Sequence, residues 1–401
     1  MGNYIDLDLE TPFQPLSPVK PDNFKGRIDI IKKILRYMNK SLKCEVQHFF
    51  LTGSKGMGKT SVAEFIIEEV KEINMISVYI SNKGNESVEA LASNILKALI
   101  NKFPQENKLD RVKSWFGEHV SEIEFHGTKI TFNLDKIIKE HVKENFLDYL
   151  LQAYENLKDN YNGILIVIDD INGLSNSKEF VDWYKNFADT LNVEEYYKMP
   201  LYFLLAGYPE KFDKMVSLEK SFGRLFHYAH VDELKENEIK EFYKETFKSI
   251  NITIEEDALE CITYYTSGVP LTMQYIGDSL FWMIEQNNIT LKDTKEAIIL
   301  ASHEIRNKQL RVLNKIKFDI YEDILIRIAE NKYEIFEVSD LKKILSEKQQ
   351  DYLNEFLKEM INIHILNKNT DNEKYEFIDK LDYSYYFIKS FEKRYNQIPP
   401  N

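Results

Sequence analysis

The stretch VQHFFLTGSKGMGKTSVAEFIIEEV, residues 46–70, joins an apolar run, a glycine-containing loop and an amphipathic segment. Its centre, GSKGMGKT at 53–60, has the spacing G-x-x-x-x-G-K-[ST]. In this pattern the glycines let backbone N–H groups turn inward around a phosphate, and the positive end of the following helix adds to the attraction. We expect Lys59 to reach the outer phosphates of a nucleotide and the Thr60 hydroxyl to bind Mg²⁺. The strand before and the helix after favour this interpretation over a plain glycine-rich turn.

The length and composition are those of a globular protein with two or three domains, in which 43% of 401 residues are hydrophobic and 29% are charged. No apolar window is long enough for a membrane span, and the acidic N-terminus lacks the apolar core of a secretory signal. Cys44 and Cys261 are far apart, so we expect buried thiols in a reducing cytoplasm. The net charge of −13 argues against non-specific nucleic-acid binding as the main activity and leaves a local basic patch open.

Strands and helices alternate through the first half of the chain. The sequence predicts a buried strand at 46–52 and a second strand at 75–81, and continuous apolar runs at 164–169 and 200–206 predict strands covered on both faces. Residues 227–231 are a candidate fifth strand. Helical spacing predicts helices at 26–39, 59–73 and 87–103, the last with Ser87 as its N-cap. This alternation predicts a three-layer α/β P-loop domain around a parallel sheet.

The domain boundaries follow from changes in pattern. A proline-rich lead-in at 1–25 precedes an α/β domain at 26–234, which carries an inserted hairpin at 121–132 between helical stretches at 108–120 and 134–160. Only helices are expected over 235–306, as an all-α lid. Residues 307–401 then run helix, helix, helix and two short strands, the order of a winged helix.

A second motif, ILIVIDD at 164–170, ends an apolar strand with two carboxylates. In an α/β sheet this is the edge that binds ligands. We expect Asp169 to hold Mg²⁺, directly or through water, and Asp170 to orient or deprotonate an attacking water. By itself the motif is more typical of a strand that ends in a solvated turn; after a phosphate loop it predicts nucleotide hydrolysis.

Together these motifs resemble an AAA+/STAND-type P-loop ATPase of the origin-recognition-like and archaeal-ATPase branches, over roughly residues 11–390. GSKGMGKT and ILIVIDD resemble the Walker A and B elements, PFQPLSPVKPDNFKGR resembles a lead-in with an F-x-G-R box, and TSGVPLTMQYIG resembles the G-x-P motif of the lid. The resemblance implies ATP and ADP with Mg²⁺ as ligands. It implies nucleotide contacts from the two boxes and the loop: Phe24, Gly26, Arg27, Gly53, Ser54, Lys55, Gly56, Met57, Gly58, Lys59, Thr60, Ser61 and Pro270.

The chain also departs from the family pattern. In the family an acidic residue usually stands three positions after the arginine of the F-x-G-R box, and here that position is Ile30. The first turn of the expected lid helix, residues 271–274, lacks the arginine that serves as sensor 2 in AAA+ proteins. Tyr208 follows the expected sensor strand, either as a substitute polar group or as a turn residue. The second acid, Asp170, is one methylene shorter than the usual Glu. These departures imply tight nucleotide binding and slow hydrolysis, as in STAND-type switches.

Two further residues carry open alternatives. Arg224 lies where the family often places an arginine finger, which would act in trans on a neighbouring subunit; it is equally a candidate for a surface ion pair. Arg27 is either a nucleotide contact or an anchor for the lead-in.

The winged helix does not have the charge of a DNA reader. Its third helix is expected to expose Asp351, Glu355 and Glu359 against Lys358, a surface that repels phosphates. A contact with protein is therefore favoured over DNA. The aromatic run at 383–395 is expected to pack between helices and not to stack on bases.

We therefore expect an ATP-dependent switch that controls a protein partner or a homo-oligomer, for example in antiviral defence or mobile-element control. A DNA-binding initiator of the origin-recognition type is the alternative. A non-hydrolysing scaffold stabilised by nucleotide is a third possibility. The residues do not distinguish ATP from GTP.

Overall fold

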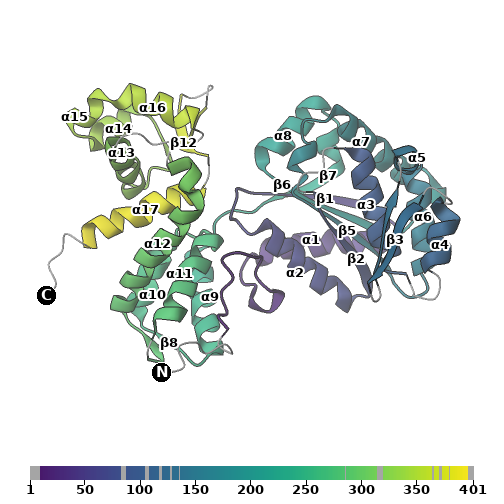
Figure 1. The fold of residues 1–401 in the computed structure, drawn as a ribbon, viewed down its shortest axis with the longest axis horizontal. Helices are drawn as coiled ribbons and strands as arrows, with labels where there is room; N and C mark the ends of the chain where they lie inside the picture. Colours follow the sequence, from purple (N-terminus) through teal and green to yellow (C-terminus); the bar gives the residue numbers. More distant parts are fainter. Residues whose placement is uncertain are drawn as a thin grey trace. The chain divides into compact units, whose positions relative to one another are not determined.

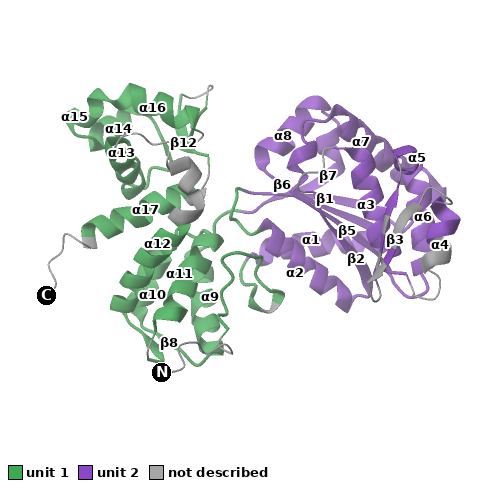
Figure 2. Ribbon diagram, in the orientation of Figure 1, with its two compact units in different colours: residues 1–26, 54–58, 232–401 green, residues 27–53, 59–231 purple. Residues whose placement is uncertain are grey.

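The computed structural model describes residues 10–395, with gaps at 83–86, 104–107, 117–119, 127–128, 135, 285, 314–318, 364, 370–372 and 379. The first nine residues of the lead-in and the predicted turn of the hairpin at Gly127 lie outside the described residues. The chain divides into two compact units, shown in Figure 2. Unit 1 comprises residues 1–26, 54–58 and 232–401, and unit 2 comprises residues 27–53 and 59–231.

Unit 2 is built on the predicted parallel sheet (Figure 1). The strand order is β2-β5-β6-β1-β7, and every neighbouring pair is parallel. The strands are β1 (Gln47–Thr52), β2 (Met75–Ser81), β5 (Gly163–Asp169), β6 (Leu201–Gly207) and β7 (Phe226–His230). All residues of β5 and β6 are buried, which explains why both read as unbroken apolar runs.

Helices cover both faces of this sheet. On one face lie α1 (Ile28–Ser41) and α2 (Lys59–Glu72), which contact each other and the central strands. On the other face α3 (Val88–Ile100), α6 (Phe146–Leu157) and α7 (Lys178–Val193) share the larger apolar core of the unit. The Ser87 hydroxyl accepts a hydrogen bond from Ala90 N at 3.2 Å, as an N-cap does. The predicted three-layer α/β fold is thereby confirmed.

The insertion between β2 and β5 contains the predicted hairpin. Strands β3 (Val120–His126) and β4 (Lys129–Leu134) pair antiparallel, after α4 (Lys108–Phe116). The predicted helical stretch 134–160 is divided, because α5 (Lys136–Glu144) ends one residue before Asn145 and α6 begins one residue after it. The Asn145 amide donates to the His141 carbonyl at 2.9 Å, a local side-chain bond that competes with helix continuation.

Unit 1 contains the helical region expected after the α/β domain. It comprises α9 (Glu236–Ser249), α10 (Glu256–Thr266), α11 (Pro270–Met283) and α12 (Leu291–Leu313). The prediction of helices alone was incomplete, because β8 (Thr253–Ile254) and β9 (Asn288–Ile289) form a short parallel pair. Helix α12 continues to Leu313, past the end near 306 that the sequence predicts for the helical region. Phe13 of the lead-in is buried against Phe242, Tyr243 and Phe247 of α9, which anchors the lead-in.

The C-terminal part of unit 1 has the winged-helix pattern. Helices α13 (Asp319–Glu330), α14 (Val338–Ile344), α15 (Glu347–Asp351) and α16 (Leu353–Asn362) are accompanied by an antiparallel sheet of order β10-β12-β11. Its strands are β10 (Ile335–Phe336), β11 (Leu366–Lys368) and β12 (Tyr375–Phe377); the sequence did not predict β10. In α17 (Lys380–Tyr395) the aromatics Tyr383, Tyr385, Tyr386 and Phe387 are buried, so the aromatic run packs between helices as predicted.

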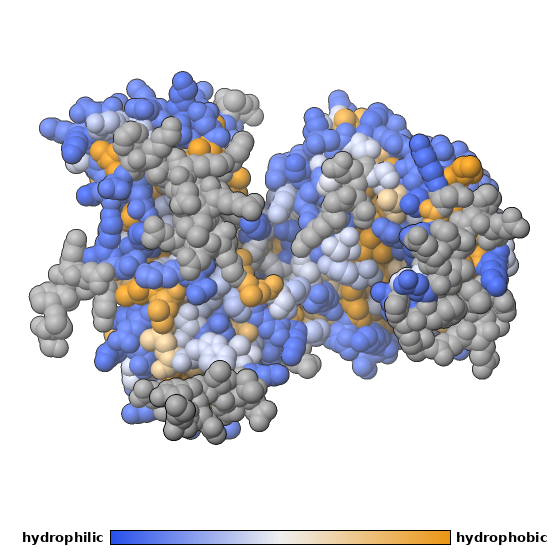
Figure 3. Space-filling model, in the orientation of Figure 1, coloured by the Kyte–Doolittle hydropathy of each residue, from blue (hydrophilic) through white to orange (hydrophobic). Residues whose placement is uncertain are grey.

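Remaining elements connect these parts. The 3-10 turns are η1 (Pro21–Asn23), η4 (Ile171–Leu174), η5 (Glu195–Tyr197) and η6 (Phe222–Leu225), and α8 (Pro209–Leu218) follows β6. Figure 3 shows mostly hydrophilic residues on the described surface, with small separate apolar patches. None of the helices in the described residues is long and apolar enough to cross a membrane.

The core of unit 2 contains a histidine, His48, that must stay neutral. It is 2% exposed, its Nδ1 lies 2.8 Å from the Tyr184 hydroxyl, and its ring stacks on Phe203. Burial, with a smaller contribution from His227, lowers the pKa of His48 to about 3. In the unfolded chain a histidine titrates near pH 6.5, so the unfolded state gains a proton as pH falls below that value while the folded state does not.

We therefore predict that acidification destabilises unit 2 through His48. Between pH 7 and pH 5 the free energy of unfolding should fall by about 2 kcal/mol from this residue, at about 1.4 kcal/mol per pH unit. His48→Gln keeps an acceptor for Tyr184 without a titrating ring. Urea unfolding of both proteins at the two pH values should show a smaller loss for the variant; an equal loss would contradict the prediction.

Candidate functional site

The loop Gly53–Thr60 connects β1 to α2 and has the backbone shape of a phosphate cradle. Gly56 and Gly58 have φ angles of 81° and 83°, in the left-handed region that favours glycine. Lys59 is the first residue of α2, so the N–H groups of the first turn of this helix stand at the loop. Such groups have no partner within a helix and attract anions. The local structure expected from the glycine spacing is therefore present.

The Lys59 side chain lies along the loop. Its ammonium group donates to the Gly53 carbonyl at 2.7 Å and lies 4.7 Å from the centre of the Tyr208 ring. Tyr208, at the end of β6, thus meets Lys59 through the face of its ring. This is a different contact from the hydroxyl substitution considered from the sequence.

Asp169 ends β5 as a buried carboxylate that is 6% exposed. Its Oδ2 accepts from the Thr60 hydroxyl at 2.7 Å and from the Tyr79 hydroxyl at 2.6 Å, and its Oδ1 accepts from Asp170 N at 3.0 Å. The structure therefore brings together the two residues expected to hold Mg²⁺, Thr60 and Asp169. It adds Tyr79 of β2, which the sequence analysis missed.

A second carboxylate, Glu64, lies one helical turn after Thr60 on α2. Burial raises the pKa of Glu64, and the neighbouring Asp169 carboxylate raises it further. Burial also raises the pKa of the Tyr79 phenol, together with its hydrogen bond to Asp169. The two neighbouring carboxylates, Glu64 and Asp169, form an electronegative site whose repulsion a cation would relieve. The sequence analysis missed Glu64, although its spacing of four residues from Thr60 places both side chains on one helix face.

Asp170 is held by a contact that the sequence did not predict. It has left-handed backbone angles, φ 57° and ψ 52°, at the start of η4. The Asn172 amide nitrogen donates to Asp170 Oδ1, and the Asn172 amide oxygen accepts from Tyr208 N at 3.0 Å. Asn172 therefore joins Asp170 to the end of β6, where Tyr208 reaches Lys59.

The tip of the loop, residues 54–58, belongs to unit 1 together with the lid helix α11. Leu271 N donates to the Gly56 carbonyl at 3.3 Å. A Cβ on Gly58 would lie 4.0 Å from Pro270 Cγ. Pro270, expected to face the nucleotide, therefore lies beside the phosphate loop within this unit.

The residues of the F-x-G-R box are divided between the units. Phe24 is partly buried, and a Cβ on Gly26 would meet Leu234 and Glu238 of unit 1 within 3 Å. Arg27, which begins unit 2, is 8% exposed and precedes α1 with a φ of 59°. This burial is consistent with the anchoring alternative for Arg27.

Arg224 is exposed in η6, just before β7. All strands of the sheet are parallel, so Arg224 stands at the amino edge, whereas Lys59 and Asp169 stand at the carboxyl edge. The five residues of β7 separate the two edges by roughly 13–17 Å. Arg224 therefore does not reach the phosphate loop of its own chain. It can have a catalytic role only by acting on the site of a neighbouring subunit.

These residues fit a nucleotide with Mg²⁺. Mg²⁺ usually takes one or two protein oxygens and completes its shell with phosphates and water. Thr60 and Asp169 supply those oxygens beside the N-terminal turn of α2. Among the described residues, no group of three or more His, Cys, Asp or Glu side chains is arranged to hold a metal ion.

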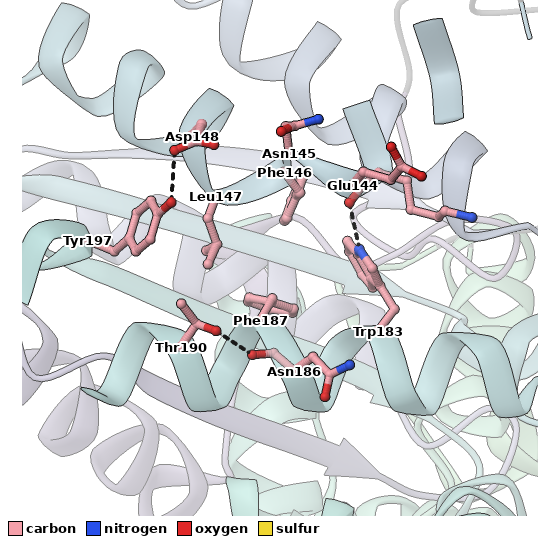
Figure 4. Close-up of a pocket in the computed structure, with 11 residues that line it drawn as sticks. Glu144, Asn145, Phe146, Leu147, Asp148, Trp183, Asn186, Phe187, Thr190 and Tyr197 are labelled. Carbon is pink, nitrogen blue, oxygen red and sulfur yellow. Dashed lines mark hydrogen bonds between the residues drawn. The ribbon is translucent and has the colours of Figure 1, made fainter. Parts of the chain in front are cut away.

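A separate hollow of about 390 Å³ lies between the start of α6, α7 and η5, and none of the loop residues lines it (Figure 4). Its polar groups largely satisfy one another. The Tyr197 hydroxyl donates to Asp148 at 2.8 Å, and Trp183 Nε1 donates to the Lys143 carbonyl at 3.0 Å. The hollow is therefore not part of the phosphate site.

Tyr79 provides a test of the metal assignment. Its hydroxyl and that of Thr60 both donate to Asp169 Oδ2, so a cation that uses this oxygen competes with them. In Tyr79→Phe one competitor is lost, and we predict that Mg²⁺ strengthens nucleotide binding about 5- to 10-fold more than in the unmodified chain, the effect of one such hydrogen bond. Calorimetry with Mg²⁺ and with EDTA measures the difference. An unchanged Mg²⁺ effect would exclude the competition.

Comparison with known proteins finds a family match and similar solved structures. Residues 45–216 match the family model described as AAA domain. A Walker-type ATPase of Pyrococcus abyssi superposes with a TM-score of 0.54 at 16% identity, covering 92% of this chain and 98% of that chain. The ORC2 protein of Aeropyrum pernix, in ADPNP-ADP complexes, superposes with a TM-score of 0.52 at 11% identity, covering 93% and 96%. No curated protein matches the sequence.

At these identities the two structures establish similarity of fold, and the family model covers the phosphate loop, Asp169 and Asp170. Residues 45–216 therefore match an AAA domain, in a chain whose fold resembles those of an archaeal Walker-type ATPase and of an ORC protein.

Proposed function

We propose that the protein is a slowly hydrolysing, ATP-dependent AAA+/STAND-like switch that controls a protein partner or an assembly, for example in defence or mobile-element control. The observation that carries this proposal is the contact of Thr60 with Asp169 beside Lys59, at the start of α2. It joins the Walker A and B elements in one site. Adenine is inferred from the AAA-domain match and not from a base-reading residue.

The residues have separate tasks in hydrolysis. Lys59 and the N–H groups at the start of α2 would bind the phosphates, and Thr60 and Asp169 would hold Mg²⁺. Mg²⁺, when bound, neutralises charge on the β- and γ-phosphate oxygens. Asp170 accepts the proton of the attacking water as its oxygen bonds to the γ-phosphorus and the bond to the β,γ-bridging oxygen breaks.

Two features support a slow rate. The Asp170 carboxylate is engaged by Asn172, so it must reorient or share that bond to reach a water. The first turn of α11 offers no arginine, and Gln274 on that turn instead accepts a hydrogen bond from Gln14 N of the lead-in at 2.7 Å. Both features withhold groups that would stabilise the transition state.

The contact of Leu271 with Gly56 supports the switch. Phosphate binding uses the backbone of this loop, and the same backbone accepts a hydrogen bond from the N-terminus of the lid helix. A nucleotide that reshapes the loop therefore changes the partner of α11. Differential contacts of this kind are what a nucleotide-driven switch requires.

A homo-oligomer would give Arg224 a role. In trans its guanidinium would stabilise charge on the γ-phosphate of a neighbouring copy.

The alternative is a DNA-binding initiator of the origin-recognition type, and its support is the similarity of fold to an ORC protein. The winged helix does not favour it, since Asp351 and Glu355 are exposed around α16. On α17, Lys393 and Arg394 pair with Asp323 and Glu330 of α13 and are not free for phosphates.

Two substitutions separate binding from turnover. Lys59→Ala should abolish ATP binding, because the phosphates lose their cation. Asp170→Asn should leave the dissociation constant within about twofold and reduce phosphate release at least about 100-fold, the usual effect of losing a general base. Asp213→Asn, an exposed aspartate on α8, is the matched control. An unchanged rate in Asp170→Asn would refute the catalytic assignment, and phosphate release at background in the unmodified chain would favour the non-hydrolysing scaffold.

Asn172 should act on turnover by positioning Asp170. In Asn172→Ala the Asp170 carboxylate and Tyr208 N lose their shared partner, and we predict a loss in kcat of about 10-fold with little change in ATP affinity. Asn186→Ala, an exposed asparagine on α7, is the control. A loss of ATP binding equal to the loss of turnover would indicate that Asn172 supports the fold and not the carboxylate.

A further inference from the structure

Helix α1 carries three cations on one side, Lys32, Arg36 and Lys40, and Lys43 follows in the turn after the helix; we name these four residues the α1 stripe. Lys32, Arg36 and Lys40 are four residues apart, the spacing that places side chains on one helix face. All four residues of the stripe are exposed. With a rise of about 1.5 Å per residue, the helical part of the stripe extends about 12 Å, with a charge roughly every 6 Å.

The stripe has no compensating acids. None of its four side chains forms an ion pair within the described part of the chain, although Asp29 and Glu45 stand near its two ends. By contrast, on α7 Lys178 and Lys185 each pair with an aspartate four residues later. Like charges four residues apart destabilise a helix by about 0.2–0.5 kcal/mol per pair. The stripe therefore weakens α1 as an isolated helix.

Further groups strengthen the positive field beside the stripe. The Arg36 guanidinium lies 4.8 Å from the centre of the Tyr37 ring, and the Lys40 ammonium lies 5.5 Å from it. His227 of β7 stacks on the same ring. Lys33 points to the same edge, where it donates to the Tyr228 carbonyl at 2.6 Å. Burial lowers the pKa of His227, and Lys40, Lys33 and Arg36 lower it further, as converging cations do.

We propose that the α1 stripe binds the phosphate backbone of a nucleic acid. A regular row of cations that form no ion pairs in the described part of the chain matches a regular row of phosphates. An acidic protein fits less well, because protein interfaces need an apolar centre and are poor in lysine. On the described helix α1, Ile28 is 59% exposed at one end, and the other large apolar side chains are buried or partly buried. The aromatic Tyr37 and His227 beside the cations suit a base or sugar.

This surface is distinct from those considered for DNA so far. It belongs to unit 2, whereas the winged helix belongs to unit 1. It also uses no residue of the phosphate loop, so the proposal does not depend on ATP hydrolysis.

The test is binding of labelled duplex DNA, single-stranded DNA and single-stranded RNA, measured by fluorescence anisotropy over a salt series starting near about 50 mM. In the triple variant Lys32→Gln, Arg36→Gln and Lys40→Gln, binding at low salt should weaken at least about 10-fold. The slope of log K against log salt should fall in magnitude by about 2 to 3, the value for three lost phosphate contacts. The strongest of the three probes identifies the class of nucleic acid.

The control removes the same charge elsewhere in unit 2. Lys102→Gln, Lys214→Gln and Lys220→Gln together alter three exposed lysines and should leave binding near that of the unmodified chain. ATP binding by the stripe variant verifies that the unit is folded. Absent binding to all three probes at low salt, or equal weakening in both triple variants, overturns the proposal. Tighter binding to polyglutamate than to any nucleic acid overturns it in favour of an acidic protein.

Discussion

The buried carboxylate of Asp169 is the constraint on which the nucleotide site depends. An ionised carboxylate with so little exposure is costly unless donors or a cation surround it. Its donors come from three segments: Thr60 of α2, Tyr79 of β2 and the turn at Asp170. These segments meet only at the carboxyl edge of the parallel sheet. A shift of β2 by one residue would send Tyr79 to the opposite face, so sheet register and site geometry are fixed together.

The phosphate loop is shared between the two compact units. Gly53 and Lys59 belong to the sheet unit, and residues 54–58 group with the helical unit through contacts such as Leu271 to Gly56. A loop rich in glycine has few side chains to fix its shape, so backbone hydrogen bonds decide it. A ligand that binds those same backbone groups therefore acts on a segment whose covalent chain belongs to both units.

Local patterns predicted most of the fold, and contacts distant in sequence account for what was missed. Strands buried on both faces are visible as apolar runs, and the phosphate loop is visible because its eight residues are consecutive. The strands Thr253–Ile254 and Asn288–Ile289 are too short to show an alternating pattern in the sequence. At the break between α5 and α6, the Asn145 amide bonds to the backbone of the preceding turn, a contact that periodicity does not show. In the site, Tyr79 meets Asp169 because of the sheet register, which the sequence does not show. Asn172 meets Tyr208 because of the turn geometry after β5, which the sequence does not show either.

The positions of the charges were also not predicted, because the net charge of the chain does not tell where on the surface the charged side chains lie. At physiological salt, exposed charges more than about 8–10 Å apart are largely screened from each other. The excess of acids that gives the chain its net charge of −13 therefore does not cancel a row of cations spaced at about 6 Å on α1. By the same reasoning, the exposed Asp351 and Glu355 around α16 repel phosphates whatever α1 binds. The two surfaces are thus free to serve chemically different partners, an anion on α1 and a neutral or cationic surface on the winged helix.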